Sequence, residues 1–314
     1  MDEIFMKIED LLKKQESFNQ KVLFVDKDYK IIFQQRFSNF IVNPGHSIKN
    51  TTIIKWQNDK LTIENSSLFF YGLYIKKKRN VSQTPMPGVK NAVSDIFKDF
   101  KQFFDFDDFN FVPAGREDKD VLNKNGRPFF VEIINPKCNL NLLPSENLLI
   151  NEFVTLKNFE RVHGDKIKKF IHDGETSHKK TYSLFVYCSA KTDLLTLLKE
   201  EKITTQIVPD FHILDNYLNK KIQIAQKTPL RVLHRRSNLI RDRFIEIIKY
   251  ENIKGYLKIK LVSSAGTYIK EFVNGDFGRT IPSLSSILEC HCDCVQLDVE
   301  EIEKTELPDD CRFN

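Results

Sequence analysis

Short apolar runs along this chain predict a protein built mainly of strands. Strands are expected at Phe69–Tyr74, at Phe109–Val112 and at Pro128–Ile134, a strongly apolar run that follows the turn signal Asn125-Gly126-Arg127. Further strands are predicted at Val154–Val162, Tyr182–Cys188, Pro229–Leu233, Phe244–Tyr250 and Tyr256–Val262. Because strands outnumber helices without regular alternation, we predict an α+β fold with a mixed or mostly antiparallel sheet.

Helical patterns are fewer. Apolar residues recur at helical spacing within Met1–Gln15 and between Val89 and Phe104, and the segment from Thr267 begins helical. Shorter helices are expected near Leu148 and at Thr192–Glu200, while the residues between Val162 and Tyr182 read as a polar connector. Brief strand-like runs separated by turn residues, among them 22–25, 31–33 and 52–54, predict a small irregular N-terminal portion.

Composition indicates a globular protein with a mild basic excess. The 314 residues are 41% hydrophobic and include 26 Phe, and 48 Lys and Arg exceed 43 Asp and Glu. Lysines and arginines cluster at 76–79, 166–180 and 227–243. Such clusters suit a phosphate backbone, although each could equally be a solvated face. A nucleic-acid partner is therefore permitted but not required.

The cysteines form no paired C-x-x-C framework, and the first fifteen residues are charged throughout. We therefore expect a reduced, intracellular protein, nuclear or cytoplasmic, without a membrane span. The run Cys290-His291-Cys292-Asp293-Cys294 invites a metal interpretation. In a strand, however, its thiols would lie about 6.5 Å apart along one face, so we expect buried strand cysteines and no metal.

Two motifs carry the candidate chemistry. Gly115-Arg116-Glu117-Asp118-Lys119-Asp120-Val121 places Asp118 on a loop after a strand, and Ala265–Thr280 supplies Lys270. A buried nucleophilic carboxylate needs a fixed cation beside it, because desolvation alone would raise its pKa and protonate it. The alternatives are that Asp118 pairs with Arg116 or caps a turn, and that Lys270 is an exposed lysine.

The Gly115–Val121 motif followed by Asn125–Phe129 is similar to the archaeal and eukaryal tRNA pseudouridine-54/55 synthase family. Lys227–Arg236 and Ala265–Thr280 resemble further blocks of that family in the same order, and the resemblance covers roughly Ser67–Glu300. Weaker similarity is carried by Gly72–Arg79 and Gln83–Pro85. Ordered blocks of this kind are hard to assemble by chance.

The resemblance implies a pseudouridine synthase fold with two lobes flanking a catalytic cleft. Asp118 would be the nucleophile or the base at C2′, and the sequence leaves both mechanisms open. Lys270 would pair with Asp118, and Tyr182 would stack on the target uracil, although a tyrosine opening an apolar strand is also typical of a core. Arg116 would enter the space left by the flipped base or pair with a phosphate.

Basic residues in the matching blocks are expected to bind RNA. They are Lys76, Arg79, Arg127, Arg231, Arg235, Arg236 and Arg279. If Lys227–Arg236 were a strand, alternation would place Arg231 and Arg235 on one face and Arg236 on the other, so at least one face would present cations to phosphates. Arg279 could instead hold its turn together.

The expected function is isomerisation of uridine to pseudouridine in the tRNA T-loop, at position 55, 54 or both, by base flipping. The expected partner is the tRNA T-arm, with no membrane, small-molecule cofactor or metal, and the chain is expected to act as a monomer. One rival is a non-catalytic RNA-binding or tRNA-folding protein that uses the same basic cleft. Another is a protein-interaction module with contacts in the N-terminal helix and the acidic C-terminal tail.

Departures from the family pattern concern mainly the N-terminal portion. Members commonly carry a longer accessory domain with paired cysteines, whereas only about 66 residues without cysteine precede the matching region here. We therefore expect residues 1–66 to be a reduced accessory segment and residues 67–314 to be the catalytic domain. Leu73, Met86 and the run 283–288 also differ from the family's usual residues.

Overall fold

The computed structural model describes residues 6–7, 10, 52–57, 60–102, 105–137, 150–190, 206–303 and 306–312. The predicted helices near Leu148 and at Thr192–Glu200, the strand-like runs 22–25 and 31–33 and nearly all of Met1–Gln15 lie outside these residues. The run 52–54 belongs to β1 (Thr52–Gln57), which pairs antiparallel with β2 (Lys60–Asn65).

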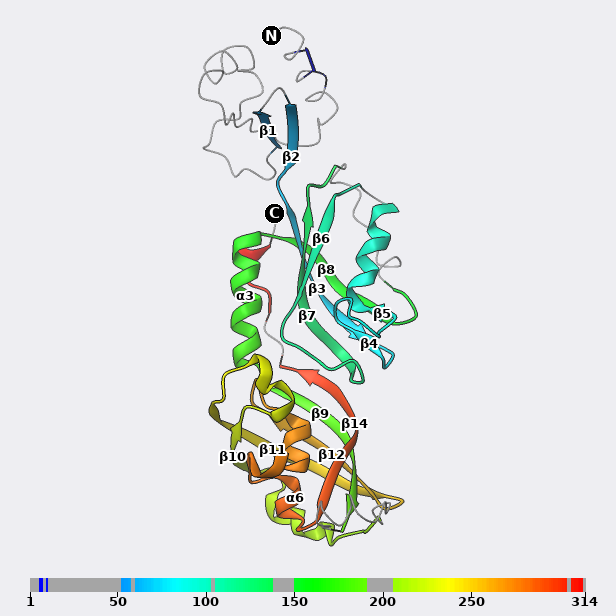
Figure 1. Cartoon of the computed structure of the whole chain (residues 1–314), viewed down its shortest axis with the longest axis vertical. Coiled ribbons are helices and arrows are strands. Elements are labelled where there is room, and N and C mark those ends of the chain that lie inside the picture. The colour runs from blue at the N-terminus through cyan, green and yellow to red at the C-terminus, as the bar shows by residue number, and fades with distance from the viewer. Residues whose placement is uncertain are drawn as a thin grey trace.

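One ten-stranded sheet runs through both lobes of the described chain (Figure 1). Its strands are β3 (Leu68–Lys76), β6 (Asp108–Pro113), β7 (Leu122–Ile134), β8 (Val154–Val162), β9 (Lys180–Ser189), β10 (Lys221–Lys227), β11 (Ile240–Ile253), β12 (Tyr256–Ser263), β13 (Thr280–Ile281) and β14 (His291–Ile302). The order is β13-β10-β11-β12-β9-β14-β7-β3-β8, with β6 also paired to β7. The β14–β7 contact is parallel and the other pairings of this sheet are antiparallel. The predicted α+β class with a mixed, mostly antiparallel sheet is confirmed.

The N-terminal lobe packs its sheet against phenylalanines from several elements. It contains β3, β6, β7 and β8, the small parallel pair β4 (Val81–Ser82) and β5 (Asn91–Ala92), and the 3₁₀ helix η2 (Val93–Gln102). Phe97 of η2 is fully buried, and its ring centroid lies 5.1 Å from that of Phe100 and 5.6 Å from those of Phe111 and Phe129. Aromatic contacts of this kind fix η2 on the sheet face.

The C-terminal lobe contains β9–β13 and most of β14. The short helices α5 (Ile269–Asn274) and α6 (Leu284–Ile287) pack against β14, and 3₁₀ turns form at η4 (Phe211–Tyr217), η5 (Leu230–Arg235) and η6 (Asp276–Gly278). β14 pairs with β9 from His291 to Ile302, and at Asp298 and Val299 it also pairs with β7 on its other edge. This strand therefore joins the two lobes through backbone hydrogen bonds (Figure 1).

The segment predicted as a polar connector contains helix α3 (Gly164–Ser177). Its buried residues Ile167 and Ile171 are one turn apart and pack on the N-terminal lobe beside η7 (Asp309–Cys311). Few apolar residues lie on this helix and many polar residues surround them, so the helical spacing of the apolar positions was not recognised in the sequence. Within the described part of the chain, no helix is both long and apolar enough to cross a membrane.

The predicted strand at Pro229–Leu233 is wrong. β10 ends at Lys227, and Leu230–Arg235 forms the 3₁₀ helix η5. Pro229 has no N–H to donate to a sheet ladder, so the strand cannot continue through it with regular pairing. The expected alternation of basic side chains on two strand faces therefore does not occur.

The Asn125-Gly126 signal marks an irregularity within a strand rather than a turn before one. β7 runs continuously from Leu122 to Ile134, and its register with β3 shifts between the pairs Tyr74↔Arg127 and Lys76↔Asn123. Gly126 has φ +109°, a conformation that L side chains rarely adopt. The glycine thus permits the irregularity at which the register between β7 and β3 shifts.

Candidate active site

Asp118 lies on the hairpin loop between β6 and β7. The two strands pair antiparallel up to Pro113↔Phe129. Gly115 begins the loop with φ +82°, and the N–H of Val121 donates to the carbonyl oxygen of Asp118 at 3.2 Å. The Asp118 side chain is 39% exposed, so this carboxylate is accessible rather than buried as the sequence argument assumed.

Glu117 anchors the Asp118 loop to the buried residues Tyr74 and Arg127. Its side chain is 1% exposed and accepts hydrogen bonds from the Tyr74 hydroxyl at 3.0 Å and from Arg127 Nε at 3.1 Å. Arg127 Nη1 also donates to the carbonyl oxygen of Ala114 at 2.8 Å. Burial and the adjacent Glu117 charge raise the pKa of Tyr74 well above its ordinary value, so this hydroxyl remains a donor. The buried contacts between Glu117 and Arg127 therefore hold the loop in position.

Lys76 supports the same loop through backbone contacts. Its Nζ donates to the carbonyl oxygen of Asp118 at 3.0 Å and to that of Val81 at 3.1 Å, and it lies 3.7 Å from Glu117 Oε1. Burial lowers the pKa of Lys76, and the nearby Glu117 charge acts in the opposite direction. Lys76 thus holds the backbone of Asp118, while the Asp118 carboxylate remains accessible.

Two cations from the C-terminal lobe face the Asp118 carboxylate. Lys270 Nζ, from α5, lies 3.1 Å from Asp118 Oδ2 and 2.9 Å from Asp120 Oδ2, and Arg231 Nη1, from η5, lies 3.7 Å from Asp118 Oδ1. Burial acts to lower the pKa of Lys270, but its bond to Asp120 and the Asp118 charge raise it overall. The predicted pairing of Lys270 with Asp118 is present in the structure.

Arg231 is itself held by a buried carboxylate. Its Nε donates to Glu271 Oε1 at 2.6 Å, and the Glu271 side chain is 6% exposed. Burial acts to lower the pKa of Arg231, and the bond to Glu271 raises it above the ordinary value. The guanidinium also lies 5.8 Å from the centroid of the Tyr268 ring. Arg231 was expected to bind RNA, and these contacts direct it toward Asp118.

Tyr182 of β9 is 9% exposed. Burial raises its pKa to about 12, against the lowering effects of the Arg127 charge and a hydrogen bond with Ser263. Its phenol is therefore neutral near pH 7, and its side chain belongs to the buried cluster that also contains Val121, the last residue of the Gly115–Val121 motif. The predicted stacking of its ring on uracil stays a prediction.

The other predicted basic residues divide into interior and surface groups. Lys76 and Arg127 are each 1% exposed and bonded to the loop, so burial excludes the phosphate contacts predicted for them. Arg116, Arg235 and Arg236 are exposed, as RNA contact requires. Their roles stay predictions.

Arg79 and Arg279 hold the protein itself together. Arg79 Nη2 lies 2.5 Å from Asp298 Oδ1 of β14, and its Nη1 donates to the carbonyl oxygen of Asp120, so it connects the lobes next to the Asp118 loop. Arg279 Nη2 donates to the carbonyl oxygen of Thr228 at 2.8 Å. Of the two roles considered for Arg279, this contact supports the structural one.

Glu117 and Glu271, which orient the site, were not predicted from the sequence. Glu117 stands inside the Gly-Arg-Glu-Asp motif, and Glu271 follows Lys270 directly. Adjacency to two proposed site residues was the available signal. It was weak, because solvent-exposed loops and helices also carry Glu beside basic residues.

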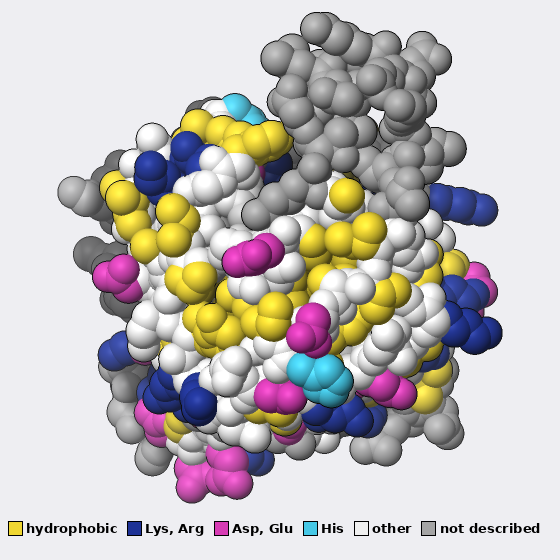
Figure 2. Space-filling model, turned by 90° about the horizontal axis from the view of Figure 1, so that it is seen from below, with side chains coloured by type: hydrophobic (Ala, Val, Ile, Leu, Met, Phe, Trp, Pro, Cys, Tyr) yellow, Lys and Arg dark blue, Asp and Glu magenta, His cyan; other side chains and the backbone are white. Residues whose placement is uncertain are grey.

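A hollow of about 600 Å³ lies away from Asp118, at the end of the C-terminal lobe. Its lining includes Phe211, His212, Asp215 and Tyr250, and none of its lining residues belongs to the Asp118 loop or to α5. Figure 2 views the molecule from this end and shows hydrophobic side chains between separate acidic and basic groups. The described residues drawn there form no continuous basic surface.

The fold and the site thus define an α+β protein in which a loop carboxylate from one lobe is held by two cations from the other. The sequence profile of the family described as Pus10, C-terminal, matches residues 69–303. The chain belongs to this family, as the motif resemblance predicted.

Relatives named tRNA pseudouridine synthase Pus10 include proteins of Mus musculus, Pyrococcus furiosus and Picrophilus torridus. The mouse protein is 34% identical over 253 residues, covering 76% of this chain and 45% of the relative. The Pyrococcus protein is 34% identical with 80% and 61% covered, and the Picrophilus protein is 31% identical with 92% and 73% covered. The chain therefore spans about half the length of the mouse relative.

Among solved structures, a chain of a Cbf5-Nop10-Gar1 complex is similar at a TM-score of 0.37 and 13% identity. The match covers 73% of this chain and 48% of that one.

Proposed function

We propose that this chain is a tRNA pseudouridine synthase that isomerises a T-loop uridine, at position 55, 54 or both, with Asp118 as its catalytic carboxylate. Membership of a family whose relatives carry that name supports the reaction class. The observation that carries the assignment of the site is the accessible Asp118 carboxylate between Lys270 and Arg231.

The reaction requires a carboxylate that stays ionised next to a sugar. Asp118 either attacks C1′ or removes the proton on C2′, and in both routes the C1′–N1 bond breaks with its electrons leaving on uracil N1. The uracil rotates and C5 bonds to C1′, a step that breaks the Asp118–C1′ bond in the first route and is accompanied by return of the proton to C2′ in the second. C5 then loses its proton and N1 gains one. The atoms of one nucleotide are rearranged, so the reaction involves no net oxidation or reduction.

The surrounding residues suit these steps. Lys270 and Arg231 stabilise the anionic form of Asp118 while the nucleotide covers it and excludes water. The neutral Tyr182 ring provides a surface for the detached uracil, and the exposed Arg116 occupies the space that the flipped nucleotide leaves. Extruding a base costs less from a loop than from a duplex, which favours a T-loop substrate.

The chain divides at residue 67 into an N-terminal segment and a catalytic unit. Residues 67–314 form the catalytic unit, which contains every residue assigned to the site, and residues 1–66 precede it. The tRNA T-arm is the partner, the protein acts as a monomer without a small-molecule cofactor, and it works in the nucleus or the cytoplasm.

A single-turnover assay on an unmodified tRNA transcript and on its isolated T-arm tests the proposal. Pseudouridine is mapped base by base with the wild type, Asp118→Asn and the control Asp293→Asn, which changes an exposed aspartate of β14. We expect product at a T-loop uridine, a rate at least roughly 1,000-fold lower in Asp118→Asn with tRNA binding retained, and an unaffected control. Salt-sensitive binding without product in the wild type would favour the non-catalytic RNA-binding alternative.

A further inference from the structure

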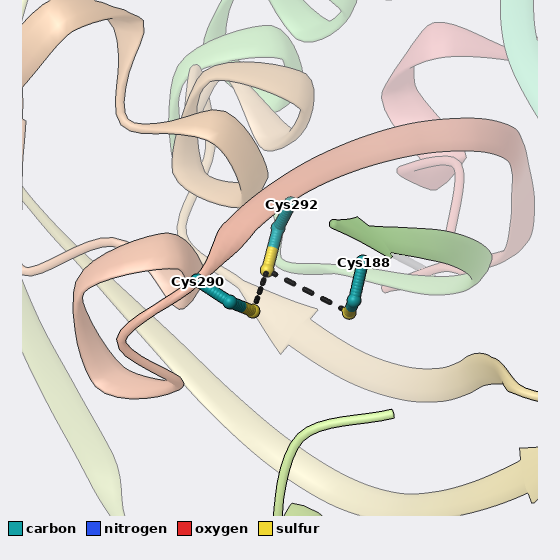
Figure 3. A group of neighbouring side chains, drawn as sticks. All are labelled: Cys188, Cys290 and Cys292. Atoms are coloured by element: carbon teal, nitrogen blue, oxygen red, sulfur yellow. Dashed lines mark hydrogen bonds between the residues drawn. The ribbon is translucent and has the colours of Figure 1, made fainter. Parts of the chain in front are cut away.

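Three buried cysteines meet in the C-terminal lobe (Figure 3). Cys188 of β9 and Cys292 of β14 lie directly opposite each other in the antiparallel register, and Cys290 immediately precedes β14. Cys292 Sγ lies 3.7 Å from Cys290 Sγ and 3.9 Å from Cys188 Sγ. All three sulfur atoms lie within 4.8 Å of one another, and each residue is at most 2% exposed.

This arrangement differs from the one expected for a regular strand. Cys290 lies in the turn before β14, where Glu289 has φ +52°, so its thiol folds back toward Cys292 instead of lying one strand repeat away. The third thiol comes from the neighbouring strand β9 and not from Cys294, whose Sγ contacts the carbonyl oxygen of Gln296 at 3.4 Å. Cys188, Cys290 and Cys292 therefore lie closer together than the strand spacing that disfavours a shared metal.

The sulfur spacing matches a metal–thiolate polyhedron. A tetrahedral ion with bonds of about 2.3 Å to sulfur places its ligands about 3.8 Å apart, close to the two shorter distances here. We propose that Cys188, Cys290 and Cys292 form a buried three-thiolate site for a thiophilic d10 cation, Zn²⁺ or Cu⁺. Sulfur ligands select these soft ions over Mg²⁺ or Ca²⁺.

Metal binding requires the three cysteines as thiolates. Binding replaces three S–H bonds by three metal–sulfur bonds and releases three protons, so affinity increases with pH. Because the thiols are buried, the ion enters as the lobe folds.

The site connects to the helix that carries Lys270. The Cys292 N–H donates to Ser285 Oγ at 2.9 Å, and Ser285 Oγ donates to the carbonyl oxygen of Val273 in α5 at 3.1 Å. An ion bound by the three cysteines would cross-link β9 to β14 next to the hydrogen bonds that connect β14 to α5. The role is structural and does not depend on the proposed isomerase activity.

Metal binding by the full-length wild type is the first test. The protein, purified under reducing conditions, is analysed for metal content, then unfolded, stripped of metal and refolded separately with Zn²⁺ or with Cu⁺ in competition with chromophoric chelators. We expect one equivalent of one of these ions per chain. Cd²⁺ serves as a spectroscopic probe, with sulfur-to-cadmium charge-transfer absorption expected for three thiolates. A wild type that binds neither Zn²⁺ nor Cu⁺ stoichiometrically would overturn the proposal.

Single substitutions locate the site. Cys290→Ser and Cys188→Ser should each lose the bound equivalent and the rise in Tm that the ion produces in the wild type, whereas Cys294→Ser and Cys311→Ser should keep both. Circular dichroism reports whether each variant folds, and the intensity of the wild-type Cd²⁺ band reports the number of thiolates without any variant. Full binding in folded Cys290→Ser, or a Cd²⁺ band of fewer than three thiolates, would contradict the assignment.

Discussion

The Nζ atom of Lys270 lies 3.1 Å from Oδ2 of Asp118, and this ion pair links the two lobes at the loop that carries the proposed catalytic group. The same ammonium bonds Asp120 at 2.9 Å. Both carboxylates belong to the β6–β7 loop, whereas Lys270 belongs to α5. Docking of the lobes therefore creates the charge environment of Asp118, and each lobe alone would lack it.

Asp120 gives this docking a pH dependence. Burial acts to raise its pKa, but the hydrogen bond and charge of Lys270 lower it overall. A folded-state pKa below the unfolded value of about 3.9 contributes stability above that pH, which is lost as the pH falls through the folded pKa. Asp120→Asn should thus lower stability at neutral pH by about 0.2–1 kcal/mol, since the side chain is half exposed, and weaken the acid dependence below about pH 4.

Thermal unfolding of the wild type and Asp120→Asn, followed from neutral to acidic pH, measures this effect. The exposed Asp293→Asn serves as the control, and it should keep the wild-type profile. Parallel pH profiles for the wild type and Asp120→Asn would show that the Lys270 contact adds nothing to stability.

Glu117→Gln should strongly destabilise the N-terminal lobe. The substitution removes the charge that faces Arg127 and Lys76 in the interior and leaves both cations without their carboxylate. Breaking a buried ion pair in this way costs about 3–5 kcal/mol. Urea unfolding measures the change in the free energy of unfolding.

The matched control for Glu117→Gln is Glu152→Gln. Glu152 pairs with Lys78 at 2.6 Å, but its side chain is 63% exposed. Loss of this surface pair should cost about 0–1 kcal/mol. Equal costs for the two substitutions would mean that burial does not set the value of the Glu117 contacts.

Glu271→Gln should reduce turnover more than substrate binding. The variant keeps the shape of the side chain but loses the charge that orients Arg231 toward Asp118. A displacement of about 1 Å in such a group can cost roughly 100-fold in rate, so we expect kcat to fall by that order while KM changes little. Single-turnover and steady-state measurements on tRNA separate the two constants.

The exposed Glu251→Gln, at the far end of β11, is the control for Glu271→Gln. It should retain the wild-type rate. If folded Glu271→Gln also retains that rate, the orientation of Arg231 does not contribute to the reaction.

Arg235→Ala and Arg236→Ala should weaken tRNA binding in a salt-dependent manner. Both residues are exposed in or beside η5, close to Arg231 in the chain. Each lost phosphate contact should reduce the slope of log K against log salt concentration by about 1. Binding titrations at several salt concentrations measure the slope. The control Lys249→Ala, at the hollow distant from Asp118, should leave the salt slope unchanged. If all three variants have the same slope, Arg235 and Arg236 do not contact tRNA phosphates.

The sequence was informative wherever one short segment carried the signal. Apolar runs predicted the strands around Phe109–Val112 and Tyr256–Val262, and the Gly-Arg-Glu-Asp motif placed Asp118 on a loop after a strand. It was misleading where a pattern had two physical meanings. Asn125-Gly126 produced a bulge instead of a turn, and the basic residues Lys76 and Arg127 proved to be interior supports.

The α+β class, the family and the two segments that supply Asp118 and Lys270 could be predicted without a structure, because strand periodicity and motif chemistry are local properties. The surroundings of these two groups depend on how the chain folds. Burial converts Arg127 from a candidate RNA contact into a partner of Glu117, and strand pairing brings Cys188 to Cys292 across 104 residues of chain. Burial and distance arise from contacts between remote segments, which no local pattern encodes.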